Sequence, residues 1–151
     1  MGIVDEVIVA CKDVLDTLLV GYVRSPYEFD TELNSERDQE KRYGFIPAEA
    51  TFAEGRAMGF TTMNHSFELK LIDCYQPEDS DAALSTKLMA QYALMQDTLK
   101  DLQKSRLQLP TPDNRIKLIS GLAMEAPLVD GENKTVELKG VFNIQYSYRN
   151  V

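Results

Sequence analysis

The sequence predicts an α+β fold, with a mainly antiparallel sheet of about four strands in two hairpins and two helices packed on one face. The strongest observation is the alternation of apolar and polar residues over 135–148, which is typical of a strand with one buried face. Residues 3–19 and 81–107 instead repeat apolar side chains at spacings of three and four, which is typical of amphipathic helices. This mixed order of helices and half-buried strands favours helices gathered on one side of a sheet.

The first helix is predicted over residues 3–19. Asp5 and Glu6 lie in its first turn, where they favour the helix dipole, and Gly21 is placed to end it. The following segment, 24–43, is rich in charged residues and poor in apolar ones. We consider two interpretations of it: a solvated surface loop, or an interaction loop that orders on assembly.

The next two segments predict a hairpin. Its strands are residues 46–53 and about 60–75, and residues 54–59, with a glycine near each end, supply the turn. Pro47 fits only the start of a strand or an edge strand, because it has no N–H to donate to a neighbour.

The second helix is predicted over about residues 81–107. Residues 79–81 (Asp-Ser-Asp) supply N-cap chemistry before it, and Pro110 and Pro112 end it. A third strand is predicted over about residues 115–125.

The turn dipeptide Asp130-Gly131 leads into the final strand. We expect the inner row of that strand, from Val136 to Tyr148, to hold the helices. Gly140 interrupts the inner row and predicts a bulge or a bend.

Composition restricts the class of protein. The length of 151 residues favours a single domain, 1–151, and the net charge of −8 argues against general nucleic-acid binding. An acidic wall that lets DNA slide past remains compatible with this charge. No apolar run approaches the length of a membrane span, and the start of the chain does not have the pattern of a signal peptide. Cys11 and Cys74 are predicted to be buried free thiols, which fits a reducing cytosolic origin.

The search for catalytic chemistry is mostly negative. His65 is the only histidine, which excludes multi-histidine metal sites, and we interpret it as a surface or structural residue in preference to a catalytic one. Residues 55–62 faintly suggest a phosphate loop but lack its Gly-Lys-Ser/Thr ending, and residues 79–81 lack the rest of a calcium loop. The sequence therefore predicts a protein that is not an enzyme and has no catalytic, cofactor or metal site.

Three short motifs carry a resemblance that covers nearly the whole chain. The first strand starts with Phe45-Ile46-Pro47-Ala48, the second ends in the proline-containing turn at 74–80, and the last carries Tyr146-Ser147-Tyr148. With the order of helices and strands, these motifs resemble the tail terminator proteins of long-tailed bacteriophages, typified by the minor tail protein that caps the phage lambda tail tube. In that family the long hairpin loop often joins the first two strands, whereas here the long charged segment precedes the first strand.

The resemblance implies an assembly function. Such proteins form a hexameric ring on the end of the tail tube, stop polymerisation of the tube and provide the docking face for the neck or head connector. The implied partners are further copies of the chain, the tail tube protein and the neck protein, with DNA only passing through the lumen and no membrane. The implied location is the head-proximal end of the tail in the virion, after assembly in the host cytoplasm.

The predicted contacts lie in two regions. The first is the 24–43 loop with the 54–62 turn, where charged and apolar residues are mixed without core periodicity. The second is the outer row of the final strand, which we expect to face a neighbouring subunit or the lumen. The candidate interface residues are Arg24, Arg37, Arg42, Arg56, Met58, Phe60, Glu137, Lys139, Asn143 and Gln145.

Other functions stay open at this point. Within assembly proteins, the alternatives are a neck or head–tail connector (tail completion) protein and a tail tube protein. A different class is a small cytosolic ligand-binding or enzymatic α+β domain, which a deep pocket containing His65 and several carboxylates would favour.

Overall fold

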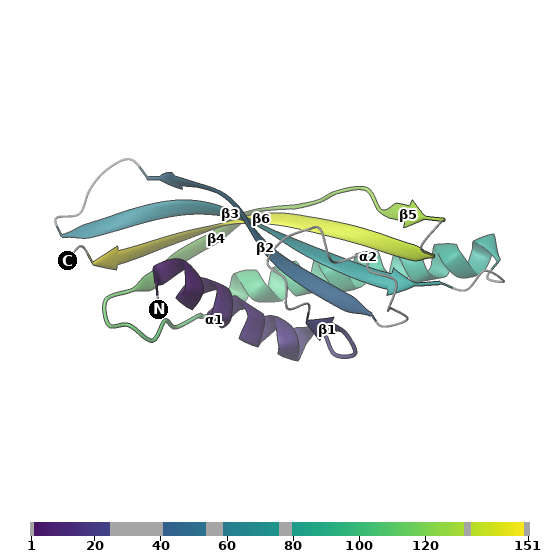
Figure 1. Cartoon of the computed structure of the whole chain (residues 1–151), viewed down its shortest axis with the longest axis horizontal. Coiled ribbons are helices and arrows are strands. Elements are labelled where there is room, and N and C mark those ends of the chain that lie inside the picture. The colour runs from purple at the N-terminus through teal and green to yellow at the C-terminus, as the bar shows by residue number, and fades with distance from the viewer. Residues whose placement is uncertain (1, 25–40, 54–58, 76–79, 132–133, 150–151) are drawn as a thin grey trace.

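The computed structural model describes residues 2–24, 41–53, 59–75, 80–131 and 134–149. In these residues two helices lie against one face of a six-stranded sheet, whose order is β1-β2-β3-β6-β4 with β5 also paired to β6 (Figure 1). All strand pairs are antiparallel except β1 with β2. The predicted fold class is confirmed, and two short strands, β1 and β5, add to the four that were expected.

The helices begin where the sequence places them. Helix α1 covers Ile3–Leu18, and Gly21 follows it with a positive φ of 89°, which only glycine adopts without strain. Helix α2 covers Asp81–Lys104 and so ends slightly before the predicted boundary. Ser80 is its N-cap, because the Ser80 side chain accepts a hydrogen bond of 3.2 Å from the backbone N–H of Ala83.

The strands form two long central elements with shorter neighbours. Strands β3 and β6 pair without interruption over their whole lengths, from Phe60 opposite Arg149 to Cys74 opposite Thr135. Figure 1 shows these two strands running the length of the sheet and reaching past both helices at the end where β2 and β6 terminate. The bounds are β1 Val23–Arg24, β2 Arg42–Phe52, β3 Phe60–Cys74, β4 Arg115–Met124, β5 Leu128–Asp130 and β6 Thr135–Arg149.

Of the two alternatives predicted at Gly140, a bulge or a bend, the bulge is wrong, because the register of β6 with β3 continues through that residue. Gly140 instead lets α2 approach the sheet. A Cβ atom there would lie 2.9 Å from Sδ of Met95 and 3.0 Å from Cδ1 of Leu99, closer than side chains normally pack. The missing side chain thus serves the packing of helix on strand.

Bulges occur instead in β4. Its register with β6 shifts between Ile116 and Leu118 and again between Ser120 and Ala123. Gly121 lies inside the second shift with φ of 66°, a conformation that favours glycine. The extra residues bend β4 at the edge of the sheet, where such irregularities are common.

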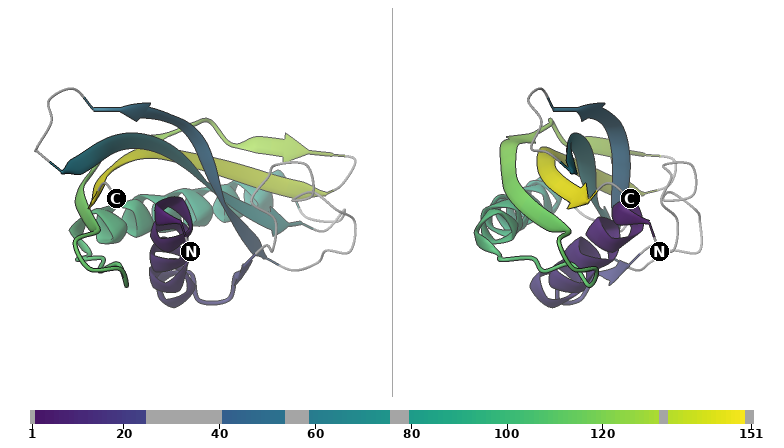
Figure 2. Two further views of the ribbon diagram at one scale, coloured as in Figure 1. Left: turned by 60° about the vertical axis from the view of Figure 1, so that its left-hand side comes forward. Right: turned by 90° about the vertical axis from the view of Figure 1, so that its left-hand side faces the viewer.

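The core lies between the helices and the sheet. Figure 2 shows both helices on the same side of the curved sheet in two further views. The inner row of β6 packs there as predicted, and the rings of Phe45 and Phe67 stack beside it with centroids 4.9 Å apart. Cys11 is buried and its pKa is raised to about 12 by that burial, whereas Cys74 is half-buried, so the predicted burial of both thiols holds only for Cys11. The buried members of the inner row are Val136, Leu138, Phe142, Ile144 and Tyr146.

Strand β2 has a buried part and an exposed part. Residues 42–46 are buried, whereas residues 48–52 are exposed, and the register with β3 shifts between Pro47 and Ala50. Among the described residues, β1 pairs only with Arg42 and Tyr43 of β2, so within them Pro47 lies in an edge stretch, as predicted.

Candidate assembly interface

The single histidine has a structural environment. His65 is 5% exposed, its ring centroid lies 4.3 Å from that of Phe67, and its Nδ1 lies 3.1 Å from the hydroxyl of Tyr146. Burial lowers the pKa of His65, although a hydrogen bond with the backbone of Ala48 acts in the opposite direction. The ring therefore joins the bulge of β2 to β6, in agreement with its interpretation as a structural residue.

Two findings concern metal ligands and membrane-spanning helices in the described part of the chain. In that part, no three His, Cys, Asp or Glu side chains are grouped so that they could hold a metal ion. Neither of its helices is apolar enough over a sufficient length to cross a membrane.

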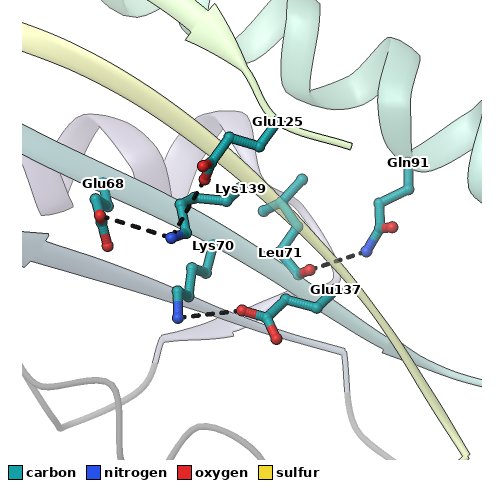
Figure 3. A network of polar contacts seen from close by, with 7 residues as sticks. All are labelled: Glu68, Lys70, Leu71, Gln91, Glu125, Glu137 and Lys139. Carbon is teal, nitrogen blue, oxygen red and sulfur yellow. Dashed lines mark hydrogen bonds and ion pairs between the residues drawn. The ribbon is translucent and has the colours of Figure 1, made fainter. Parts of the chain in front are cut away.

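Five charged residues lie on the face of the sheet that points away from the helices, and we call them the charged half (Figure 3). The ammonium of Lys70 lies 3.1 Å from the carboxylate of Glu137, and these side chains are only 5% and 15% exposed. The ammonium of Lys139 lies 3.2 Å from Glu125 and 3.7 Å from Glu68. The charged half thus consists of Glu68, Lys70, Glu125, Glu137 and Lys139.

The register explains why these ion pairs are arranged diagonally. Lys70 and Lys139 lie directly opposite each other on β3 and β6, which on its own is repulsive. Each lysine instead pairs with a carboxylate offset along the neighbouring strand, Glu137 for Lys70 and Glu68 for Lys139. Glu137 and Lys139, two of the predicted interface residues, therefore have partners within their own chain.

Helix α2 is anchored beneath the charged half. The side-chain amide of Gln91 donates a hydrogen bond of 3.0 Å to the carbonyl oxygen of Leu71 (Figure 3). It donates a second one, of 3.4 Å, to the carbonyl oxygen of Val136. One side chain of α2 thus holds the backbones of both central strands, although the buried Oε1 of the same amide has no hydrogen-bond partner among the described residues.

The same outer face has a different character farther along β3 and β6, and we call this region the neutral half. The Ser66 hydroxyl donates to Asn143 Oδ1 at 2.7 Å, and the Gln145 amide donates to Asn64 Oδ1 at 3.1 Å. These contacts are exposed to solvent. A shallow hollow of about 350 Å³ lies here, with Glu49 at its rim. The neutral half consists of Thr51, Asn64, Ser66, Ser120, Asn143 and Gln145.

The other predicted interface residues are more scattered. Arg37, Arg56 and Met58 lie outside the described residues. Arg24 belongs to β1, and Phe60 is half-buried at the start of β3. Arg42, at the start of β2, is 8% exposed and so has little surface to offer a partner. Among the predicted interface residues that the structure describes, only those on β6 therefore lie together on one surface.

Two strand edges are prominent features that the sequence prediction did not identify. Residues 48–52 of β2 are exposed, and Phe52 on that stretch is 73% exposed. On the opposite side of the sheet, β4 pairs with β6 along one side, and Leu118 on it is 55% exposed. Large apolar side chains at open strand edges are typical of surfaces that pair or become covered.

The comparisons with known proteins identify the fold. No protein-family model matches this chain, and a search of curated proteins finds no relative. Among solved structures, the chain is similar to one described as "Virion of native gene transfer agent (GTA) particle", with 14% identity and a TM-score of 0.53. The match covers 97% of this chain and 98% of the other. The two chains therefore share one α+β fold from end to end.

Proposed function

We propose that this chain is a structural protein of a phage-type virion and acts as a tail terminator. In this role it forms a ring on the end of the tail tube, stops polymerisation of the tube and presents a docking face to the neck. It acts by assembly and not by catalysis.

The end-to-end similarity to a chain of a virion particle is the observation that carries the proposal. It agrees with the order of elements and the motifs at 45–48, 74–80 and 146–148 that resemble tail terminators. The buried environment of His65 is compatible with this assembly role.

The open edges and the exposed part of the sheet fit assembly into a closed ring. A subunit that offers different edges to its two neighbours makes a head-to-tail contact, and such contacts close into a ring when the rotation fits. A tube protein or a neck protein with the same fold is the second candidate. The similarity to the virion chain is a similarity of fold, and a shared fold does not distinguish these roles.

Electron microscopy of the purified protein at increasing concentration tests the proposal. A terminator is expected to form single or paired rings and to add no further layers. Long stacks of rings would instead identify a tube protein. A particle that stays monomeric at every concentration and when mixed with tail tubes would contradict the assembly function.

A further inference from the structure

We infer that the exposed edge of β2 in one copy, residues 48–52, lies along β4 of the next copy, and that Phe52 fills the hollow between β4 and the end of α2. This inference deepens the proposed function and rests on it, because it specifies the contact between ring subunits. The occupant of the edge is thus a second copy of this chain.

The first support is that, in the described residues, neither edge is paired with a strand along its whole length. In the described residues, β1 reaches only Arg42 and Tyr43 of β2. The edge of β4 is occupied at Arg115 by an isolated bridge to Gln108, and the carbonyl of Ile119 accepts a hydrogen bond of 3.1 Å from Gln103. Because the β4 edge is occupied at these two points, strand pairing alone does not make the whole contact between copies. Side chains must contribute as well, and Phe52 is the large apolar side chain on the β2 edge.

The second support is that both edges lie at the same level of the sheet. Phe52 is opposite Met63, which is opposite Tyr146, which is opposite Ile116. A neighbour that continues the sheet without sliding along the strands therefore brings its Phe52 to Ile116. Each of the three steps from β2 to β4 is antiparallel, so the two edges run in opposite directions and form an antiparallel pair when they meet.

The third support is the hollow itself, of about 290 Å³. Directly opposite residues of antiparallel strands point to the same face, so Phe52 points to the helix side with Tyr146, which is buried in the core. The hollow lies on that side too, since α2 and the segment after it supply part of its wall. Its lining residues are Gln103, Ser105, Arg106, Leu107, Ile116, Lys117, Leu118 and Ile119.

The fourth support is the charge of the two edges. Glu49 is exposed on the β2 edge, whereas Arg115 and Lys117 are exposed on β4, and Arg106 lies beside the hollow. Opposite charges at the rim of an interface contribute little affinity but help to select the register and the partner. The two surfaces are complementary but different, so the contact is head-to-tail and can close into a ring.

A disulfide experiment tests the register. Thr51 and Leu118 lie at one level of the outer face, because Thr51 is opposite Asn64, which is opposite Gln145, which is opposite Leu118. Adjacent strands place such residues within the distance that a disulfide spans. In the double variant Thr51→Cys/Leu118→Cys, treatment with oxidised glutathione is expected to link chains into a ladder of three or more, which reduction reverses. Each single variant is expected to give no species beyond a dimer.

A second experiment tests the anchor. Phe52→Glu is expected to raise the concentration at which rings dissociate by at least about 20-fold in sedimentation measurements, since buried aromatic anchors dominate interfaces. Met89→Glu is the matched control, because Met89 is 71% exposed and lies on α2 close to Gln91, at the other end of the sheet. This control is expected to change the dissociation less than about threefold.

The outcomes separate this contact from the proposed function. Rings in the microscope without a ladder, or an equal effect of both glutamates, would overturn the β2–β4 contact and leave the ring itself in place. A ladder accompanied by open filaments instead of rings would support the contact and contradict the terminator function. A monomeric protein with no ladder would overturn both.

Discussion

The charged half and the neutral half of the outer face lie on the same two strands but use their polar side chains differently. In the charged half, Lys70 and Glu137 are nearly buried and 3.1 Å apart. In the neutral half, Ser66 donates a hydrogen bond to Asn143 and Gln145 donates one to Asn64, both at the surface. One region is committed to holding its own chain together, and the other presents uncharged groups to whatever lies beside it.

This difference shows what kind of residue can serve assembly. A nearly buried ion pair loses much of its stabilisation when one partner is drawn away, so Glu137 is poorly suited to a new contact. Exposed amides and hydroxyls exchange partners with water or protein at little cost. We therefore propose that assembly uses the neutral half and its flanking edges.

The largest predicted effect comes from breaking the charged half. Glu137→Ala removes the carboxylate beside an ammonium that is 5% exposed, and it also leaves Lys70 opposite Lys139. We expect the free energy of unfolding to fall by about 3 kcal/mol, the usual cost of removing one member of a buried ion pair. Urea denaturation of the variant and the parent protein measures this difference.

The double variant Lys70→Met/Glu137→Leu is the control for that experiment, because it removes both charges together. It is expected to lose less stability than Glu137→Ala, since apolar replacement of a buried pair is often neutral. A loss below about 0.5 kcal/mol for Glu137→Ala would show that the ion pair does not hold this half together.

The next largest effect concerns the point on β6 between the two halves. Gly140→Ala places a methyl group 2.9 Å from Sδ of Met95 and is expected to cost about 1–3 kcal/mol by overpacking. Met95→Ala makes room, so the same substitution is expected to cost less in that background, as a double-mutant cycle in urea would reveal. Equal costs in both backgrounds would mean that α2 does not press on Gly140.

A smaller effect on the free energy of unfolding is expected from protonation of His65, which lies on the helix side of the sheet behind the neutral half. The pKa of His65 is lowered by burial, so the unfolded chain binds a proton at a higher pH than the folded protein does. Stability is therefore complete above about pH 6.5 and is lost as the pH falls below it, by at most about 1.4 kcal/mol per pH unit. Urea unfolding between pH 8 and 5 should show a steeper loss for the parent protein than for His65→Gln. Parallel profiles would exclude this role.

The smallest effect is expected in the neutral half itself. Asn143→Ala removes one exposed hydrogen bond of 2.7 Å to Ser66, and its cost to the free energy of unfolding is expected to stay within about 0.5 kcal/mol. Thermal unfolding of the monomer measures it. A loss comparable to that of Glu137→Ala would erase the distinction between the two halves.

Local patterns were sufficient to predict most of the fold. Periodicity located both helices and, with shifted boundaries, all four long strands. It was most accurate for β3 and β6, whereas β2 is buried at 42–46 and exposed at 48–52, and it was predicted only from residue 46 onward. The cap at Ser80 and the end of α1 near Gly21 could also be predicted, because they depend on residues that are neighbours in the sequence. The short strands β1 and β5 were missed since two or three residues carry no period.

The candidate interface was less predictable because exposure depends on residues that are distant in sequence. Alternation placed Glu137 and Gln145 in the same row, but only the register shows that Lys70 neutralises the first. Phe52 looks like a core residue in the sequence, and only the short reach of the helices and of β1 leaves it exposed. The glycine at position 140 was explained by the shape of its own strand, whereas the structural reason for it is the close packing of α2 on β6.

Hydrogen–deuterium exchange at low and high protein concentration tests the central claim most directly. If copies assemble through the neutral half and its edges, the amides of residues 48–52 in β2 and 116–121 in β4 become protected as concentration rises. Exchange in the charged half, at residues 68–72 and 137–139, stays the same. Protection that appears in the charged half, or an unchanged exchange pattern in samples that contain rings, would contradict this account.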